Sequence, residues 1–163
     1  SGGVGSAAIQ LAKARGARVI AVAGDKKQQS VLDAGADQAL VRGASLEVAL
    51  GENAVDVVID LVGGGDWPEL LTILRPFGRY AVSGAIAGPI VELDLRTLYL
   101  KDQRFMGCTV LDDGVFGRLV GLIERGDIKP LLARCFALDA VAEAQAFFLD
   151  KKFTGKLVID MAL

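Results

Sequence analysis

Segments with a helix pattern and segments with a strand pattern alternate along the first half of the chain, and few folds are built in that order. Apolar residues recur at helical spacing over residues 4–14, and residues 17–23 follow as a short, nearly continuous apolar run, typical of a parallel strand covered on both faces. The alternation continues with a helix over 25–34, a strand over 38–41, a helix over 45–50, a strand over 55–61, a helix over 67–74 and a strand over 79–83. Because each parallel crossover needs a covering helix, we predict an α/β fold with a Rossmann-type, doubly wound parallel sheet.

The second half of the chain has a less regular order. Its expected elements are an extended piece over 90–93, a helix over 96–101, a strand over 104–110, helices over 115–125 and 139–149, and a final strand over 156–161. Two local signals accompany the pattern: Asp25 with Gln28 has the spacing of a capping box, and residues 76–78 form a turn before the strand at 79. With 163 residues in total, we expect residues 1–163 to form one domain.

A glycine-rich turn, Ser1-Gly2-Gly3-Val4-Gly5, opens the first helix. Without Cβ atoms in the turn, a pyrophosphate can approach the N–H groups at the helix N-terminus, and we predict cofactor contacts at Gly2, Gly3, Val4 and Gly5. The fingerprint's first glycine and its leading strand would lie before Ser1, so we expect a fragment of a longer enzyme, truncated at its N-terminus and lacking the first strand of the sheet. That place is either a gap or is filled by another strand, such as residues 156–161 or a strand of a neighbouring copy.

Charge and composition exclude several classes of protein. The net charge of −2 is unsuited to nucleic acid, and no apolar run is long enough to cross a membrane or act as a signal peptide, so we expect a soluble, cytoplasmic protein. The two cysteines, Cys108 and Cys135, are expected to be buried thiols. Since the chain has no histidine, it cannot form a Ser-His-Asp triad or a His-based zinc site by itself.

Five blocks of the sequence, in order, resemble the medium-chain dehydrogenase/reductase superfamily, and in particular its quinone-oxidoreductase-like branch. The blocks are SGGVGSAAIQLAKARGARVIAVAGDKKQQSVLDAGAD (1–37), VDVVIDLVGG (55–64), LRPFGRYAVSGAIAG (74–88), IVELDLRTLYLKDQRFMGCTV (90–110) and FTGKLVIDM (153–161). The resemblance implies that this chain is the C-terminal, cofactor-binding domain. It also implies that an N-terminal domain supplies the substrate cleft and, in zinc-dependent members, the metal ligands, so no zinc is expected in this chain.

The end of the strand over 17–23, which is the second strand of a complete Rossmann sheet, indicates which nicotinamide cofactor is bound. NAD-selective domains usually place an acidic residue there, but this chain has Ala23, followed by Gly24, Asp25, Lys26 and Lys27. The small residue leaves room for a 2′-phosphate, two lysines can neutralise it, and Lys27 matches a lysine of NADPH-dependent quinone reductases by resemblance. We therefore predict NADPH in preference to NADH. The alternative interpretation is that Asp25 only caps a helix and the lysines are a solvated surface.

Further cofactor contacts are expected where strands end, because ligands bind outside the carboxyl edge of open α/β sheets. The candidates are Val62, Gly63, Ser83, Gly84 and residues 107–109. Asp60 and Trp67 are expected to be structural.

No residue of this chain is an evident catalytic acid, so catalytic residues stay unassigned, and we expect the fragment alone to bind cofactor with negligible turnover. The leading functional hypothesis is an NADPH-dependent reductase of a small-molecule quinone or α,β-unsaturated carbonyl. Alternatives are the cofactor domain of a zinc-dependent alcohol dehydrogenase or of an enoyl reductase, and a non-catalytic nucleotide-binding module. The segment from Ile90 to Leu93 resembles the family's exposed edge strand, which implies a homodimer.

Overall fold

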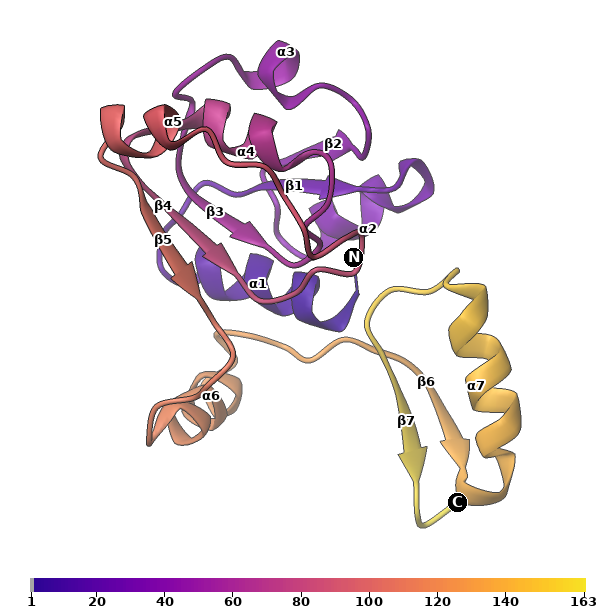
Figure 1. The fold of residues 1–163 in the computed structure, drawn as a ribbon. Coiled ribbons are helices and arrows are strands. Elements are labelled where there is room, and N and C mark those ends of the chain that lie inside the picture. Colours follow the sequence, from indigo (N-terminus) through magenta and orange to yellow (C-terminus); the bar gives the residue numbers. More distant parts are fainter. Residues whose placement is uncertain (1) are drawn as a thin grey trace. The chain divides into compact units, whose positions relative to one another are not determined.

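The computed structural model describes residues 2–163 and divides into two compact units. The first unit consists of Ser1–Arg42 and Phe116–Leu163, and the second of Gly43–Val115. The strands form three sheets, ordered β1–β2, β3–β4–β5 and β6–β7, and every pair of neighbouring strands is parallel (Figure 1). The predicted α/β class is therefore confirmed.

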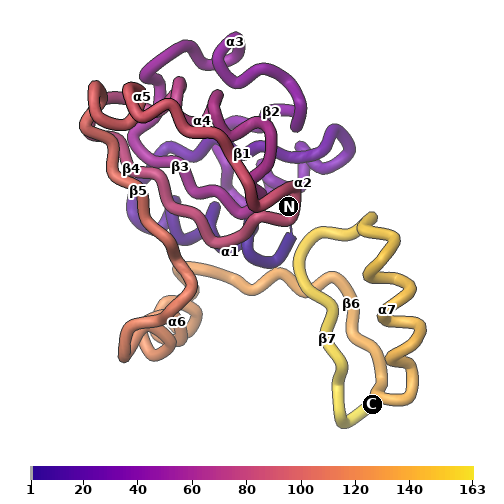
Figure 2. The backbone as a smooth tube through the Cα atoms, in the orientation of Figure 1, coloured from indigo at the N-terminus to yellow at the C-terminus, as the bar shows by residue number. Residues whose placement is uncertain are grey.

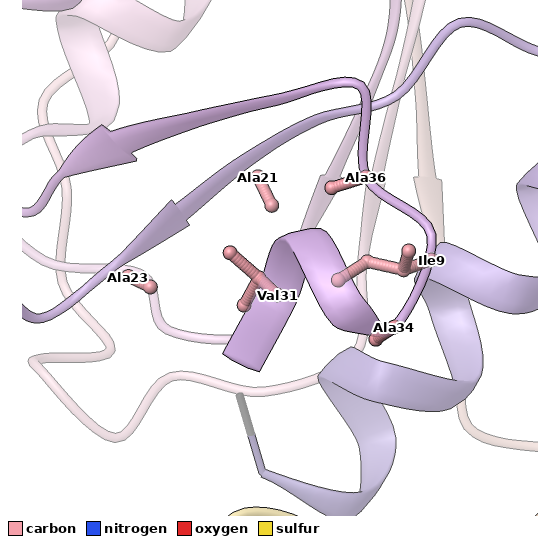
Figure 3. Close-up of a cluster of buried hydrophobic side chains, with 6 residues drawn as sticks. All are labelled: Ile9, Ala21, Ala23, Val31, Ala34 and Ala36. Carbon is pink, nitrogen blue, oxygen red and sulfur yellow. The ribbon is translucent and has the colours of Figure 1, made fainter. Parts of the chain in front are cut away.

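The N-terminal part of the first unit is a compact helix–strand layer. Its elements are α1 (Gly3–Lys13), β1 (Ile20–Ala23), the 3-10 turn η1 (Asp25–Lys27), α2 (Gln28–Asp33) and β2 (Gln38–Val41). Side chains from α1, β1, α2 and the turn after α2 fill its core, with Val31 of α2 only 1% exposed (Figure 3). Because the residues are mostly alanines, α1 and α2 can pack closely on the sheet.

The expected capping box at residue 25 is wrong. Gly24 is the N-cap of η1 and Lys27 that of α2, and neither makes a side-chain cap bond. Asp25 instead lies inside the 3-10 turn, which Lys27 closes by donating its N–H to the Gly24 carbonyl at 2.8 Å.

The C-terminal part of the first unit contains a strand that the sequence pattern did not reveal. Its elements are α6 (Val115–Glu124), which begins at the boundary with the second unit, β6 (Leu132–Ala137), η2 (Leu138–Ala140), α7 (Val141–Asp150) and β7 (Lys156–Asp160). The missed strand β6 pairs with β7, and α7 runs beside them (Figure 2). Residues 156–161 therefore do not substitute for a first strand of the β1–β2 sheet, and that alternative is wrong.

The second unit is a three-stranded sheet with helices. Its elements are α3 (Leu46–Leu50), β3 (Val55–Asp60), α4 (Trp67–Ile73), β4 (Leu74–Val82), α5 (Leu95–Leu100) and β5 (Arg104–Gly107). Helices α4 and α5 lie along one side of this sheet (Figure 1). Trp67 of α4 packs edge-on against Tyr80 and Phe105, at ring-centroid distances of 5.9 and 5.8 Å, so its predicted packing role is confirmed.

Strand β4 begins earlier than predicted. It starts directly after α4 and continues through residues 76–78, where a turn was expected. Strand β4 has a bulge at these residues, because Val55 of β3 pairs with Leu74 whereas Val57 pairs with Arg79. Strand β5 ends at Gly107 rather than at residue 110. Within residues 2–163, no helix has the length and hydrophobicity needed to span a bilayer.

Candidate functional site

Among the described residues, no side chain caps the N-terminus of α1. Its first helical hydrogen bond runs from the Ser6 N–H to the Gly2 carbonyl, at 2.9 Å, so the N–H groups of Gly3, Val4 and Gly5 precede it. The N-cap is Gly2, which has no side chain to accept from them, and the first turn contains no acidic residue. A Cβ added at Gly2 would meet no atom within 4 Å. This open end of the helix fits a phosphate group, because the donors and the helix dipole both favour negative charge.

Lys156 is a residue of this region that the sequence did not point to. The parallel bridge between Gly2 and Gly155 brings the start of β7 to the glycine turn. A Cβ at Gly3 would overlap the outer part of the Lys156 side chain, including its ammonium group. A positive charge therefore lies at the N-terminus of α1. No local pattern could have revealed it, since 153 positions separate the two residues in sequence.

The predicted 2′-phosphate residues follow β1 directly. Ala23, the last residue of β1, is 1% exposed, and Gly24 begins the turn that leads to the two lysines. The two lysines differ: Lys26 is exposed, whereas Lys27 is half-buried and donates from Nζ to the Phe153 carbonyl at 2.8 Å. Lys27 is therefore not simply a solvated surface residue.

Val62 lies in a tightly held loop at the carboxyl end of β3 in the second unit. The buried carboxylate of Asp60 accepts the N–H groups of Val62 and Gly63 through Oδ1, at 2.8 and 2.9 Å. The Tyr80 hydroxyl donates to Oδ2 at 2.6 Å. Burial, followed by the hydrogen bond and charge of Asp60, raises the pKa of Tyr80 well above its ordinary value, so this hydroxyl stays protonated. The expected structural role of Asp60 is confirmed.

Ser83 and Gly84 line an open pocket of about 540 Å³ at the carboxyl ends of β4 and β5. The candidates at 107–109 line the same pocket, so the structure brings these two predicted groups together, while Val62 is not part of the lining. Gly84 is tightly placed, since a Cβ there would lie 2.7 Å from the Leu61 carbonyl oxygen.

Both cysteines are exposed, so the expectation of buried thiols is wrong. Cys108 comes just after the end of β5, where it borders the pocket. Cys135 lies in β6, four of whose six residues are exposed in the described structure.

The described residues do not form a zinc site. In residues 2–163, no group of three or more histidine, cysteine, aspartate or glutamate side chains is arranged to hold a metal ion. The chain as a whole contains no histidine.

Comparison with known proteins identifies relatives along almost the whole chain. The family model described as zinc-binding dehydrogenase matches residues 3–125. Acryloyl-coenzyme A reductase of Sulfurisphaera tokodaii is 32% identical over 98% of this chain and 48% of its own length, and quinone oxidoreductase-like protein 2 of Bos taurus is 32% identical over 99% and 51%. The crystal structure of a putative alcohol dehydrogenase from Sinorhizobium meliloti 1021 is 49% identical, with a TM-score of 0.89 over 98% of this chain and 46% of that one. The chain thus spans about half the length of these relatives.

Proposed function

This chain belongs to the zinc-binding dehydrogenase family, and from that premise we propose that residues 1–163 act as the nicotinamide-cofactor domain of an oxidoreductase. The observation that supports this most directly is the N-terminus of α1, where the N–H groups of Gly3, Val4 and Gly5 precede the first helical hydrogen bond. The Lys156 ammonium lies beside Gly3. These groups would hold the cofactor's pyrophosphate. Further contacts are proposed at the strand ends of the second unit, through Val62, Ser83 and Gly84.

The proposed cofactor is NADPH rather than NADH. The end of β1 has the small, buried Ala23 where an acidic residue would accept hydrogen bonds from the ribose hydroxyls of NADH. Gly24 continues the chain without a side chain, and Lys26 and Lys27 supply two positive charges for the 2′-phosphate. Lys27 is the principal ligand in this proposal, since its ammonium is already held in place.

The proposed reaction is hydride transfer to a quinone or an α,β-unsaturated carbonyl compound. Two relatives support this substrate class by their names, acryloyl-coenzyme A reductase and quinone oxidoreductase-like protein 2. The bound nicotinamide supplies the hydride, and this chain binds and orients the cofactor. A zinc-dependent alcohol dehydrogenase is the second candidate, favoured by the 49% identity to a putative alcohol dehydrogenase. The chain by itself is expected to bind cofactor with negligible turnover.

We further propose a cytoplasmic homodimer that pairs through the segment from Ile90 to Leu93. Residues 90–94 belong to no sheet in the described chain, and Ile90 is 87% exposed. An exposed segment that pairs with no strand of its own chain can pair with an identical segment of a second copy. Light scattering of the chain should give a dimer mass, and a monodisperse monomer at working concentration would contradict the proposal.

The cofactor assignment is tested by replacing one lysine at a time. Lys27→Ala should weaken NADPH binding by about 1.5–3 kcal/mol, roughly 10- to 100-fold, because it removes a charge-assisted bond to the 2′-phosphate. Binding of NADH, which has no 2′-phosphate, should be nearly unchanged. Isothermal titration calorimetry with both cofactors measures this, and Lys129→Ala is the matched control, because it removes an exposed lysine outside the proposed site. Unchanged NADPH affinity in Lys27→Ala would refute the assignment.

A further inference from the structure

A short segment near the C-terminus, residues 153–156, lies against the cofactor residues of the first unit. Three separate contacts join them. They are the Lys27 Nζ bond to the Phe153 carbonyl, the bridge between Gly2 and Gly155, and the Lys156 side chain over Gly3. The segment thus contacts both Lys27, the residue proposed to bind the 2′-phosphate, and the glycine turn proposed to bind the pyrophosphate. More than 120 residues separate the segment from either of them in sequence.

The 153–156 segment is itself firmly held. The Phe153 ring stacks on Phe147 of α7, with centroids 5.4 Å apart and planes inclined by 23°. The Lys156 N–H donates to the Leu131 carbonyl at 2.9 Å. Gly155 has a φ of +93°, and a Cβ there would overlap the Leu131 carbonyl oxygen, so only glycine fits this position. The Phe153 carbonyl is therefore a fixed acceptor and not part of a loose tail.

We propose that the 153–156 segment determines cofactor selectivity by holding the Lys27 ammonium in place for the 2′-phosphate. This inference rests on the proposed function, since it concerns how the same site distinguishes NADPH from NADH. An ammonium has three N–H donors, and the Phe153 carbonyl takes one, which leaves two for a phosphate. A carbonyl accepts without neutralising the charge, so Lys27 keeps its full attraction for a phosphate dianion.

The physical advantage is preorganisation. A free lysine loses much of its rotamer freedom when it binds a ligand, and that loss reduces the affinity. Because the Phe153 carbonyl has already restricted Lys27, less freedom is lost when the 2′-phosphate binds. NADH gains nothing from this, since its 2′-hydroxyl makes no ion pair. The segment should therefore change the ratio of the two affinities and not only their overall strength.

The test uses two substitutions that disturb the segment without touching Lys27. Gly155→Ala displaces it through the strained backbone and the Leu131 carbonyl. Gly126→Ala is the matched control, because Gly126 also has a positive φ, +77°, but open space around its Cβ position. Phe153→Leu, which removes the stacking on Phe147, provides the test if Gly155→Ala does not fold.

Dissociation constants for NADPH and NADH are measured by calorimetry for each variant, alone and combined with Lys27→Ala. We expect the NADH-to-NADPH ratio of dissociation constants to fall about three- to tenfold in Gly155→Ala or Phe153→Leu and to stay unchanged in Gly126→Ala. In the Lys27→Ala background the same substitutions should leave the ratio unchanged, because the segment acts through that lysine.

Three results would overturn the inference. The first is an equal loss of both affinities, which indicates a general structural role. The second is a fall in the ratio that persists in the Lys27→Ala background. The third is a rise in the ratio, which shows that the carbonyl competes with the phosphate for Lys27. A wild-type chain that binds neither cofactor, or binds both equally, refutes the proposed function itself and is thereby distinguished from these three.

Discussion

At the scale of single residues, Tyr80 shows how one hydroxyl can fix a loop. It is 3% exposed and donates to Asp60, whose other carboxylate oxygen accepts two N–H groups of the loop after β3. A buried carboxylate that loses one hydrogen-bond donor is left with an uncompensated part of its desolvation cost. The position of Val62 therefore depends on Tyr80 through Asp60.

Tyr80→Phe should lower the free energy of unfolding by about 1–3 kcal/mol, because it removes the hydroxyl while keeping the ring and its aromatic neighbours. Tyr99→Phe is the matched control, since Tyr99 is 61% exposed, and it should change stability by less than about 0.5 kcal/mol. Urea unfolding of the three proteins measures both values. Equal midpoints for Tyr80→Phe and the wild type would contradict this account of the loop.

The sequence could predict individual site residues only where the signal was local. The glycine turn, Ala23 and the lysine pair were identified because they lie within 27 residues that follow one pattern. Lys156 and the Phe153 carbonyl were not, because their proximity to that turn depends on a long-range bridge between two glycines. Local spacing contains no information about such a contact.

At the scale of elements, Asp37 joins three of them. Its carboxylate accepts from the Lys13 ammonium at the end of α1, at 2.9 Å, and from the Val19 N–H just before β1, at 2.7 Å. Its own N–H donates to the Val19 carbonyl at 2.8 Å, next to the first paired residues of β1 and β2. The Lys13 hydrogen bond, and after it the Val19 N–H, lower the pKa of Asp37 below its ordinary value.

This shift predicts a pH dependence. Since folding favours the ionised form of Asp37, its stabilising contribution is present above the unfolded-state pKa of about 3.9 and is lost as pH falls through the lower folded-state pKa. The wild type should therefore have a higher urea midpoint than Asp37→Asn at pH 7, and the difference should shrink below about pH 4. Asp113→Asn, at an exposed residue, is the control. A difference that stays constant down to pH 2 would show that ionisation is not its cause.

Most elements were predictable, and the failures have physical reasons. Strand β2 agrees with its predicted bounds because three of its four residues are apolar and it lies between turn signals. Strand β6 was missed because Arg134 interrupts its apolar residues and only Phe136 of the strand is buried. Asp25 does not cap the expected helix, because a 3-10 turn replaces the first turn of that helix. The hydrogen bond from the Lys27 N–H to the Gly24 carbonyl stabilises this turn. For β6 and Asp25, hydrogen bonding and burial in the fold outweighed the local pattern.

At the scale of the whole molecule, the proposed cofactor residues are divided between two units. The glycine turn, the lysine pair and the 153–156 segment belong to the first, and the Asp60-anchored loop and the pocket near Ser83 belong to the second. The order of elements along the sequence was sufficient to predict an α/β fold, and family membership supports it. The return of the C-terminal segment to the first unit could not be predicted, because it depends on pairing between segments far apart in sequence.

The proposed function requires that a dinucleotide binds at the N-terminus of α1 through the N–H groups of its first turn. The most direct test is a titration of the isotope-labelled chain with NADPH, followed by the backbone amide signals in NMR spectra. We expect saturable changes that are largest for Gly3, Val4 and Gly5, with further changes at Lys27 and Lys156. Signals of the glycine turn that stay unmoved while the chain is saturated with NADPH, or no change anywhere at millimolar cofactor, would contradict it.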